Sequence, residues 1–198
     1  MEEVTITQAL SRRRTVRQFS RASISMASLE RLIWAAQGAT DDSGKRTAPS
    51  AHAMHPLRLF VVANHVEGLD KGLYEIDPLD LSVKPLMSSD LRVALRKASI
   101  GDPQWVTDAA CIIAFCADMV SPSQAFADQK PYGLRGPRYV YLEAGAAAQN
   151  LQLQAVSEEL GSVWVGGFDD EATAEILGLQ APVTPIILMC VGHAASEG

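Results

Sequence analysis

The unbroken apolar run at positions 109–117 limits the possible folds of this chain more than any other segment. It reads Ala-Ala-Cys-Ile-Ile-Ala-Phe-Cys-Ala. A strand with one solvated face alternates polar and apolar residues, whereas a strand buried on both faces is apolar throughout. The run therefore predicts a strand that other elements cover on both sides.

The rest of the chain predicts helices and strands in irregular order. Short apolar or alternating patterns predict five more strands, at 57–63, 72–78, 82–86, 162–165 and 186–191. The second and third of these are expected to pair. Helical spacing predicts shorter helices at 6–13, between an N-cap at Ser25 and a stop at Gly38, at 90–98 and at 170–177. Because helices and strands do not alternate strictly, we expect an α+β fold.

The longest predicted element is a helix from about Tyr139 to Leu160, which ends at Gly161. Its middle, 144–148, reads Ala-Gly-Ala-Ala-Ala and carries almost no side chains, so that another backbone can approach closely. Apolar and amide side chains mix in the following turns. This pattern is typical of a helix that is buried on most sides.

Composition indicates one domain over residues 1–198, or a chain that completes its core in a dimer. Of the 198 residues, 47% are hydrophobic, which suits a sizeable core. The start, Met-Glu-Glu-Val, lacks the features of a secretory signal and no apolar run reaches transmembrane length, so we expect a cytoplasmic protein without a membrane partner. The three cysteines lack CxxC spacing and lie in apolar runs, which predicts buried, reduced thiols: Cys111, Cys116 and Cys190.

A cluster of arginines near the N-terminus predicts a site for one small anion, most naturally a phosphate. Residues 12–17 read Arg-Arg-Arg-Thr-Val-Arg. Guanidinium groups match phosphate oxygens, and alternation along an extended segment would point Arg13, Thr15 and Arg17 to one side. A nucleic-acid surface is excluded because the pI is about 5.2 and no second basic cluster follows. The alternative is a solvated basic face on the first helix.

A second candidate segment precedes the strand at 57–63. Small residues at Pro49, Ser50 and Ala51 would let a flat ligand approach the backbone. His52 and His55 form an HxxH that is half of a zinc site, but no matching Cys or carboxylate pair accompanies it, so no metal site is predicted. Histidines near a ligand or at the surface are the alternatives.

Two further segments combine glycines with groups suited to catalysis. Gly166 and Gly167 permit close approaches that a side chain would block, although a tight turn explains them equally well. Lys130 and Tyr132 could supply charge stabilisation and proton transfer, although the prolines and glycines around them also suit a rigid loop. Neither GxGxxG after a strand nor GxxxxGK[ST] occurs, which excludes a Rossmann or P-loop nucleotide site.

Taken in order, these motifs resemble those of the FMN-dependent nitroreductase superfamily and, more narrowly, the SagB-type dehydrogenases. The similarity extends over nearly the whole chain and rests on five motifs: RTAPSA at 46–51, EGLDKGLY at 67–74, YGLRG at 132–136, LEAG with QNL at 142–151, and VGGFDD at 165–170.

The resemblance implies a nitroreductase-like α+β fold, in which helices flank a central, mostly antiparallel sheet. It also implies a homodimer around the long helix, with two FMN sites at the subunit interface and residues from both chains in each. The expected activity is oxidoreduction by hydride transfer through flavin N5. The residues expected to hold the FMN phosphate and ribityl chain are Arg13, Arg14, Thr15 and Arg17. Those expected around the isoalloxazine are Pro49, Ser50, Ala51, Gly166 and Gly167, with Lys130 and Tyr132 handling protons.

Two departures from the family pattern leave the substrate open. A further basic residue after the last strand is missing unless His193 substitutes for it, and Pro131 separates Lys130 from Tyr132 where azole-forming members have an adjacent pair. The substrate is therefore either an azoline-containing peptide or a nitroaromatic or quinone reduced by NAD(P)H. A flavin-binding protein without turnover is the other alternative.

Overall fold

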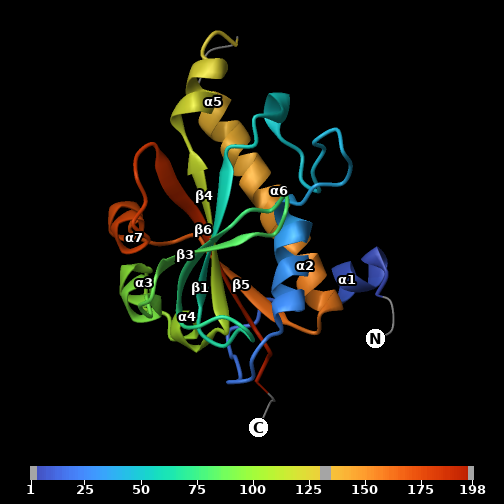
Figure 1. Cartoon of the computed structure of the whole chain (residues 1–198), viewed down its shortest axis with the longest axis vertical. Coiled ribbons are helices and arrows are strands. Elements are labelled where there is room, and N and C mark those ends of the chain that lie inside the picture. Colours follow the sequence, from blue (N-terminus) through green and yellow to red (C-terminus); the bar gives the residue numbers. More distant parts are fainter. Residues whose placement is uncertain (1–3, 130–134, 196–198) are drawn as a thin grey trace.

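The computed structural model describes residues 4–129 and 135–195 (Figure 1). Six strands form one sheet in the order β3-β2-β1-β4-β6-β5, and every neighbouring pair is antiparallel. The strands are β1 (Leu57–Ala63), β2 (Gly72–Ile76), β3 (Val83–Met87), β4 (Cys111–Asp118), β5 (Gly161–Val165) and β6 (Val183–Gly192). The helices are α1 (Ile6–Arg12), α2 (Met26–Gln37), α3 (Arg92–Ala98), α4 (Trp105–Asp108), α5 (Val120–Ala125), α6 (Arg135–Ser157) and α7 (Asp170–Ile176), with a 3-10 turn η1 (Ala51–Ala53).

The predicted doubly buried strand is β4, an interior strand of this sheet. Ile113 pairs with Val61 of β1 on one side and with Met189 of β6 on the other. Residues of alternating parity face opposite layers, so Ile113 belongs to one hydrophobic cluster and Ile112 to the other. The prediction from the apolar run is confirmed, as is the α+β architecture.

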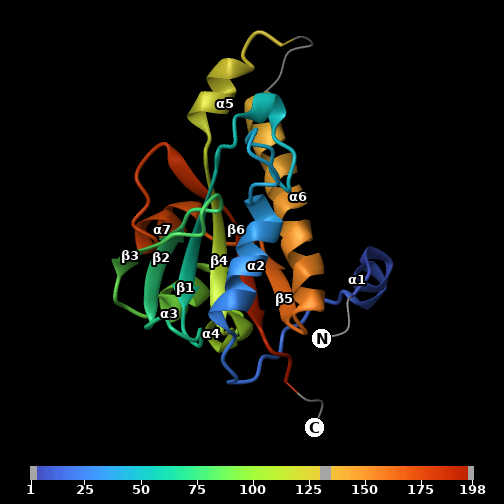
Figure 2. The ribbon, with the colours of Figure 1, turned by 45° about the vertical axis from the view of Figure 1, so that its right-hand side comes forward.

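Helices form a layer on each face of the sheet. Figure 2 shows α2 and α6 side by side on one face, with α3 and α7 on the other. Leu32 of α2 and Ala147 of α6 pack with the Ile113 side of β4, whereas Leu95 of α3 packs with the opposite side. In the ranges 4–129 and 135–195, no helix is both long and apolar enough to span a membrane.

Short polar signals set the helix ends. The Ser25 hydroxyl accepts a hydrogen bond from the Ser28 N–H at 3.0 Å, and Gly38 is the C-cap of the same helix. Asp169 caps α7 by accepting from the Ala172 N–H at 2.9 Å. These side chains satisfy N–H groups that the first turn leaves without helical partners.

The polar segment that follows β4 contains a short helix. Asp118 accepts from the N–H groups of Val120 and Ser121 and so begins α5. Helix α6 begins at Arg135, four residues before the predicted start. Proline is tolerated in a first turn, where N–H groups lack helical partners, so Pro137 does not delay the helix.

Candidate functional site

The arginine-rich segment is fixed to the edge of the sheet by backbone pairing. Thr15 pairs with Ser162 of β5 in a parallel bridge, and the Val16 N–H donates to the Ser162 carbonyl at 3.0 Å. A Cβ on Gly161 would lie only 2.7 Å from the Val16 side chain. Glycine at this position therefore permits the close approach of the segment to β5.

A cleft of about 210 Å³ lies beside this junction. Its walls include Arg12, Arg13 and Arg14, and Glu159 is the one carboxylate among its described lining residues. The Arg14 guanidinium donates to the carbonyls of Ser11 and Arg13, at 2.9 and 2.7 Å. The excess of positive charge makes the cleft suitable for an anion.

Buried polar groups back the same cleft. Gln152 of α6 and Ser162 of β5 both line it, and the Gln152 amide donates to the Ser162 hydroxyl at 3.2 Å. Both residues are buried. The arginines are therefore backed in part by a polar pair, whose hydrogen bond joins α6 to the sheet.

Arg17 lies in different surroundings from Arg13. Its guanidinium carbon is 5.5 Å from the centroid of the Trp105 ring of α4, a cation–π arrangement. Neither Thr15 nor Arg17 lines the cleft that Arg13 lines. The alternation expected to point all three to one side does not gather them around this cleft, because Arg13 still caps α1, with its N–H bonded to the Ala9 carbonyl.

The glycine pair follows the other end of β5 and borders open space. The Ile100 N–H donates to the Gly167 carbonyl at 2.8 Å, which fixes the glycine loop to the segment after α3. A Cβ on Gly166 would meet no atom within 4 Å, and one on Gly167 would lie 3.3 Å from the end of Ile100. Neither glycine has a positive φ. Gly166 is therefore distinguished by the open space beside it and not by an unusual backbone conformation.

Ile100 and Trp105 are features of this face that sequence reasoning missed. Ile100 is 78% exposed beside the glycine loop, and Trp105 supports Arg17. An isoleucine followed by Gly-Asp-Pro-Gln-Trp was the available signal, but nothing in the sequence places it beside residues 166–167.

The loop that carries Pro49, Ser50 and Ala51 packs at the N-terminal end of α6. The Ser50 hydroxyl accepts from the His55 N–H at 2.8 Å. The His52 ring lies 4.9 Å from Phe126, in an edge-on arrangement. Three non-glycine residues of this segment have positive φ: His52, Ala53 and His55. Such strain persists only where the surroundings enforce it, and it is common at ligand-binding segments.

Within one chain, this loop and the arginine cleft lie beside different positions along the axis of α6. Glu143, which hydrogen-bonds Ser50, and Gln152, which lines the cleft, are separated by nine residues, or about 14 Å along a helix. Figures 1 and 2 show η1 near one end of α6 and α1 near the other. Lys130 and Tyr132 lie outside the described residues.

The segment after β6 returns to the arginine cleft without bringing a basic side chain to it. The His193 carbonyl accepts from the Ser20 N–H, and the Ala195 N–H donates to the Gln18 carbonyl, both at 2.9 Å. Ala194 lines the cleft. Over residues 4–129 and 135–195, His193 is not among its lining residues.

A buried polar network behind the 49–51 loop was not predicted. Glu143 is 4% exposed and accepts from the Gln37 amide at 3.2 Å. Burial raises its pKa, against the opposing effects of hydrogen bonds from Ser50 and Gln37 and of the charge on Arg46. A carboxylate within an apolar, alanine-rich helix was the signal that could have identified it. In the described ranges, no cluster of three or more His, Cys, Asp or Glu side chains could hold a metal ion.

A family comparison accounts for this arrangement of sheet, cleft and loops. The model of the nitroreductase family matches residues 10–193. The chain belongs to the nitroreductase family. It therefore belongs to a family of oxidoreductases whose members generally use flavin cofactors.

Individual relatives agree with this assignment. A protein of Methanocaldococcus jannaschii named as a nitroreductase is 32% identical over 98% of this chain and 93% of its own length. The crystal structure of a protein from Ralstonia eutropha, also named as a nitroreductase, superposes with a TM-score of 0.80 at 25% identity, over 100% of this chain and 87% of that one. A chain of the E. coli microcin synthetase McbBCD complex has the same fold, with a TM-score of 0.76 at 21% identity, over 99% of this chain and 75% of that one.

Proposed function

We propose that this nitroreductase-family chain is an FMN-dependent oxidoreductase. The observation that carries the proposal is the placement of two features at the ends of β5. The arginine cleft adjoins Ser162 at the start of the strand, and the open position at Gly166 follows its last residue. Four strand residues span about 13 Å. This arrangement suits an elongated ligand with a phosphate at one end and a flat ring at the other.

Each candidate residue would act through its own chemistry. Arg13 and Arg14 would neutralise the phosphate, with Thr15 as a hydroxyl donor, and Arg17 would bring positive charge beside Trp105. Gly166 and Gly167 would leave room for the ring. When bound, FMN would supply reversible two-electron chemistry, with hydride transfer at N5. Proton handling by Lys130 and Tyr132 remains a prediction.

We propose further that a second copy of the chain completes each site. Pro49, Ser50 and Ala51 would come from the partner, which would explain why one chain keeps them apart from the arginines. The outer face of α6 supports this proposal, since Tyr141 and Leu142 are 57% and 64% exposed. Exposed large apolar side chains that form a contiguous patch are typical of protein–protein contacts.

A mixed dimer would test the sharing of the site. In a heterodimer of Arg13→Ala and Ala51→Trp chains, a shared site puts both changes in one site and neither in the other, so one FMN is retained. If each site belonged to one chain, both sites would be damaged and no FMN would be retained. Differently tagged copies, purified together, allow the flavin to be counted.

Two substrate classes fit this site. A SagB-type role, oxidation of an azoline-containing peptide, is supported by the motif order and by the shared fold with a chain of the microcin synthetase complex. NAD(P)H-dependent reduction of nitroaromatics or quinones is supported by the names of the relatives. Anaerobic reduction of the bound flavin by NADH or NADPH would favour the second class, and failure with both would favour the first. A flavin-binding protein without turnover would neither accept electrons from any donor nor reoxidise with any acceptor.

The absorption spectrum of the purified protein tests the cofactor itself. We expect bound flavin in the wild type, and its loss from Arg13→Ala and Arg17→Ala without loss of the folded state. Arg21→Ala is a matched control, because Arg21 follows the same segment but lines a different cavity, with His65 and Lys71. Full retention of flavin by both test variants would refute the assignment of the arginines.

A further inference from the structure

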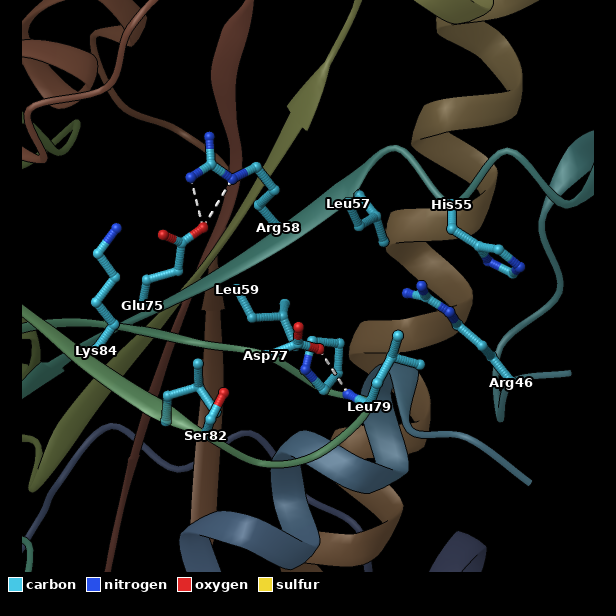
Figure 3. A pocket seen from close by; sticks show the side chains of 12 residues that line it. Arg46, His55, Leu57, Arg58, Leu59, Glu75, Asp77, Leu79, Ser82 and Lys84 are labelled. Carbon is cyan, nitrogen blue, oxygen red and sulfur yellow. Dashed lines mark hydrogen bonds and ion pairs between the residues drawn. The ribbon is translucent and has the colours of Figure 1, made fainter. Parts of the chain in front are cut away.

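A second cavity lies away from both the arginine cleft and the glycine loop, and Figure 3 shows it from close by. It encloses about 400 Å³ beside β1, β2 and β3, a volume in the range of small-molecule sites. Its apolar floor is formed by Leu57, Leu59 and Ile76, which belong to the cluster packed under α2 and α6. The cavity thus lies on the face of the sheet that α2 and α6 cover.

Arg46 lines this cavity and has an unused hydrogen-bond donor buried in its wall. Its Nη1 donates to the Gln37 side chain at 3.2 Å, whereas its Nε is buried and has no partner. Nε and Nη2 form the edge of a guanidinium that binds carboxylates in a bidentate manner. Figure 3 shows the guanidinium extending from the loop toward the strands.

His55 supplies a second unpartnered nitrogen beside Arg46. Its Nδ1 is buried without a hydrogen bond, while its backbone is held by Ser50. Burial and the charge of Arg46 both lower the pKa of His55, so the imidazole is neutral near pH 7 and can donate from Nδ1–H. Buried donors without partners are rare in native structures and call for a specific explanation.

The remaining charged groups leave the cavity favourable for an anion. Arg58 and Glu75 neutralise each other, with Nε–Oε1 at 2.8 Å. Asp77 accepts from the Leu79 N–H at 2.8 Å. Lys84 and Asp77 both line the cavity and carry opposite charges, so Arg46 is the remaining charge among its described lining residues; Glu143, which interacts with the charge of Arg46, does not line the cavity.

We propose that this cavity binds a small carboxylic acid with an apolar body. Small side-chain shifts would expose Arg46 Nε and His55 Nδ1 to the cavity, where the carboxylate would accept hydrogen bonds from both, and the apolar part would lie on Leu57, Leu59 and Ile76. An inorganic anion would satisfy the donors but leave the floor in contact with water, so the carboxylate with an apolar group fits better. The proposal does not depend on whether the chain binds flavin.

The position of the two donors gives binding a structural consequence. Arg46 and His55 flank the loop that contains Pro49, Ser50 and Ala51, and three residues in or next to that loop have positive φ. A ligand held by both flanks would restrain the loop. Ligand binding in this cavity would thus restrain the segment that is proposed to line the flavin of the partner.

Calorimetric titration with phenylacetate tests the site, with 2-phenylethanol as the neutral analogue and inorganic phosphate as the simple anion. We expect phenylacetate to bind the full-length protein about tenfold more tightly than either comparator. Arg46→Gln is expected to lose about tenfold in affinity, and Lys45→Gln, which removes an exposed neighbouring cation paired with Asp41, is expected to bind as the wild type does.

Because Arg46→Gln also disturbs Gln37, a wild-type measurement accompanies it. The imidazole nitrogen resonances of His55 are expected to shift on titration with phenylacetate and not with 2-phenylethanol. Equal binding of phenylacetate and its alcohol, equal binding of phosphate, wild-type affinity in Arg46→Gln, or an unmoved His55 signal would each overturn the proposal.

Discussion

Gly166→Ala is expected to change the affinity for FMN without changing the stability of the fold. The added Cβ would meet no atom of the chain within 4 Å, and the residue lacks a positive φ. We therefore expect the free energy of unfolding without cofactor to change by less than about 1 kcal/mol in either direction. For a chain of this length the corresponding shift in Tm is at most about 2–4 °C.

The same methyl group should weaken FMN if the flavin ring lies against Gly166. Forcing a methyl group into a packed contact costs about 1–3 kcal/mol, which corresponds to roughly 5- to 150-fold weaker binding. Titration of the apoprotein with FMN, followed by the quenching of flavin fluorescence, measures this loss. Urea denaturation, followed by tryptophan fluorescence, measures the stability of the same preparation.

Gly161→Ala is the matched control on the same strand. Its Cβ would lie 2.7 Å from Val16, so it should lower the free energy of unfolding by about 1–3 kcal/mol. If Gly166→Ala lost as much stability as Gly161→Ala, the open space described at Gly166 would be wrong. If Gly166→Ala kept both stability and FMN affinity, the ring would not approach this glycine, and the proposed orientation of the cofactor along β5 would fail.

Three further predictions concern the fold. Gly136→Ala should lower the free energy of unfolding in urea by about 1–3 kcal/mol, because its Cβ would lie 2.4 Å from the backbone of α5; wild-type stability would refute that packing. All three thiols should resist Ellman's reagent at about pH 8 until the protein unfolds. Burial raises the pKa of Cys111 to about 12 and also raises the pKa values of Cys116 and Cys190. Rapid labelling of the native protein would contradict their burial. Burial alone would raise the pKa of Glu158, but hydrogen bonds, chiefly from Arg31, lower it below 4.5 in the folded state. The ion pair thus stabilises the fold above that pH and loses its effect as the pH falls through the lowered pKa. Arg31→Met should therefore cost about 1–2 kcal/mol near neutral pH and progressively less in acid, as pH-dependent urea denaturation would show; a cost independent of pH would exclude this origin.

The parts of the fold that follow local rules could be predicted from the sequence. An apolar run identified β4, and Ser25 marked the start of α2, because caps and periodicity depend on neighbours in the chain. The start of α6 and the existence of α5 could not be predicted in this way. The two helices also meet at Gly136, which fits against the α5 backbone in a contact between segments that have no sequence pattern in common.

The candidate site likewise combines features that the sequence shows with contacts that only the fold creates. The concentration of positive charge at the arginines was visible in the sequence because charge is a property of the residues themselves, and the anion site there stays a prediction. Their surroundings were not: Arg17 stacks on Trp105, and the polar backing comes from Gln152 and Ser162, through contacts that only the topology creates. The residue types could be predicted from the sequence, but their surroundings could not: Thr15 and Arg17 do not line the cleft that Arg13 lines.

The position of β5 at the sheet edge is compatible with the proposed sharing of the site between two chains. An interior strand has neighbours on both sides, but β5 pairs with β6 on one side only, so its other side accepts the arginine segment at Ser162 and leaves Gly166 open. The loop at 49–51 is tied instead to Glu143, nine residues before Gln152 on α6. In the proposed dimer, a second copy docked on the exposed face of α6 would bring its 49–51 loop to the arginine cleft and Gly166 of the first copy, with α6 and the edge pairing left intact.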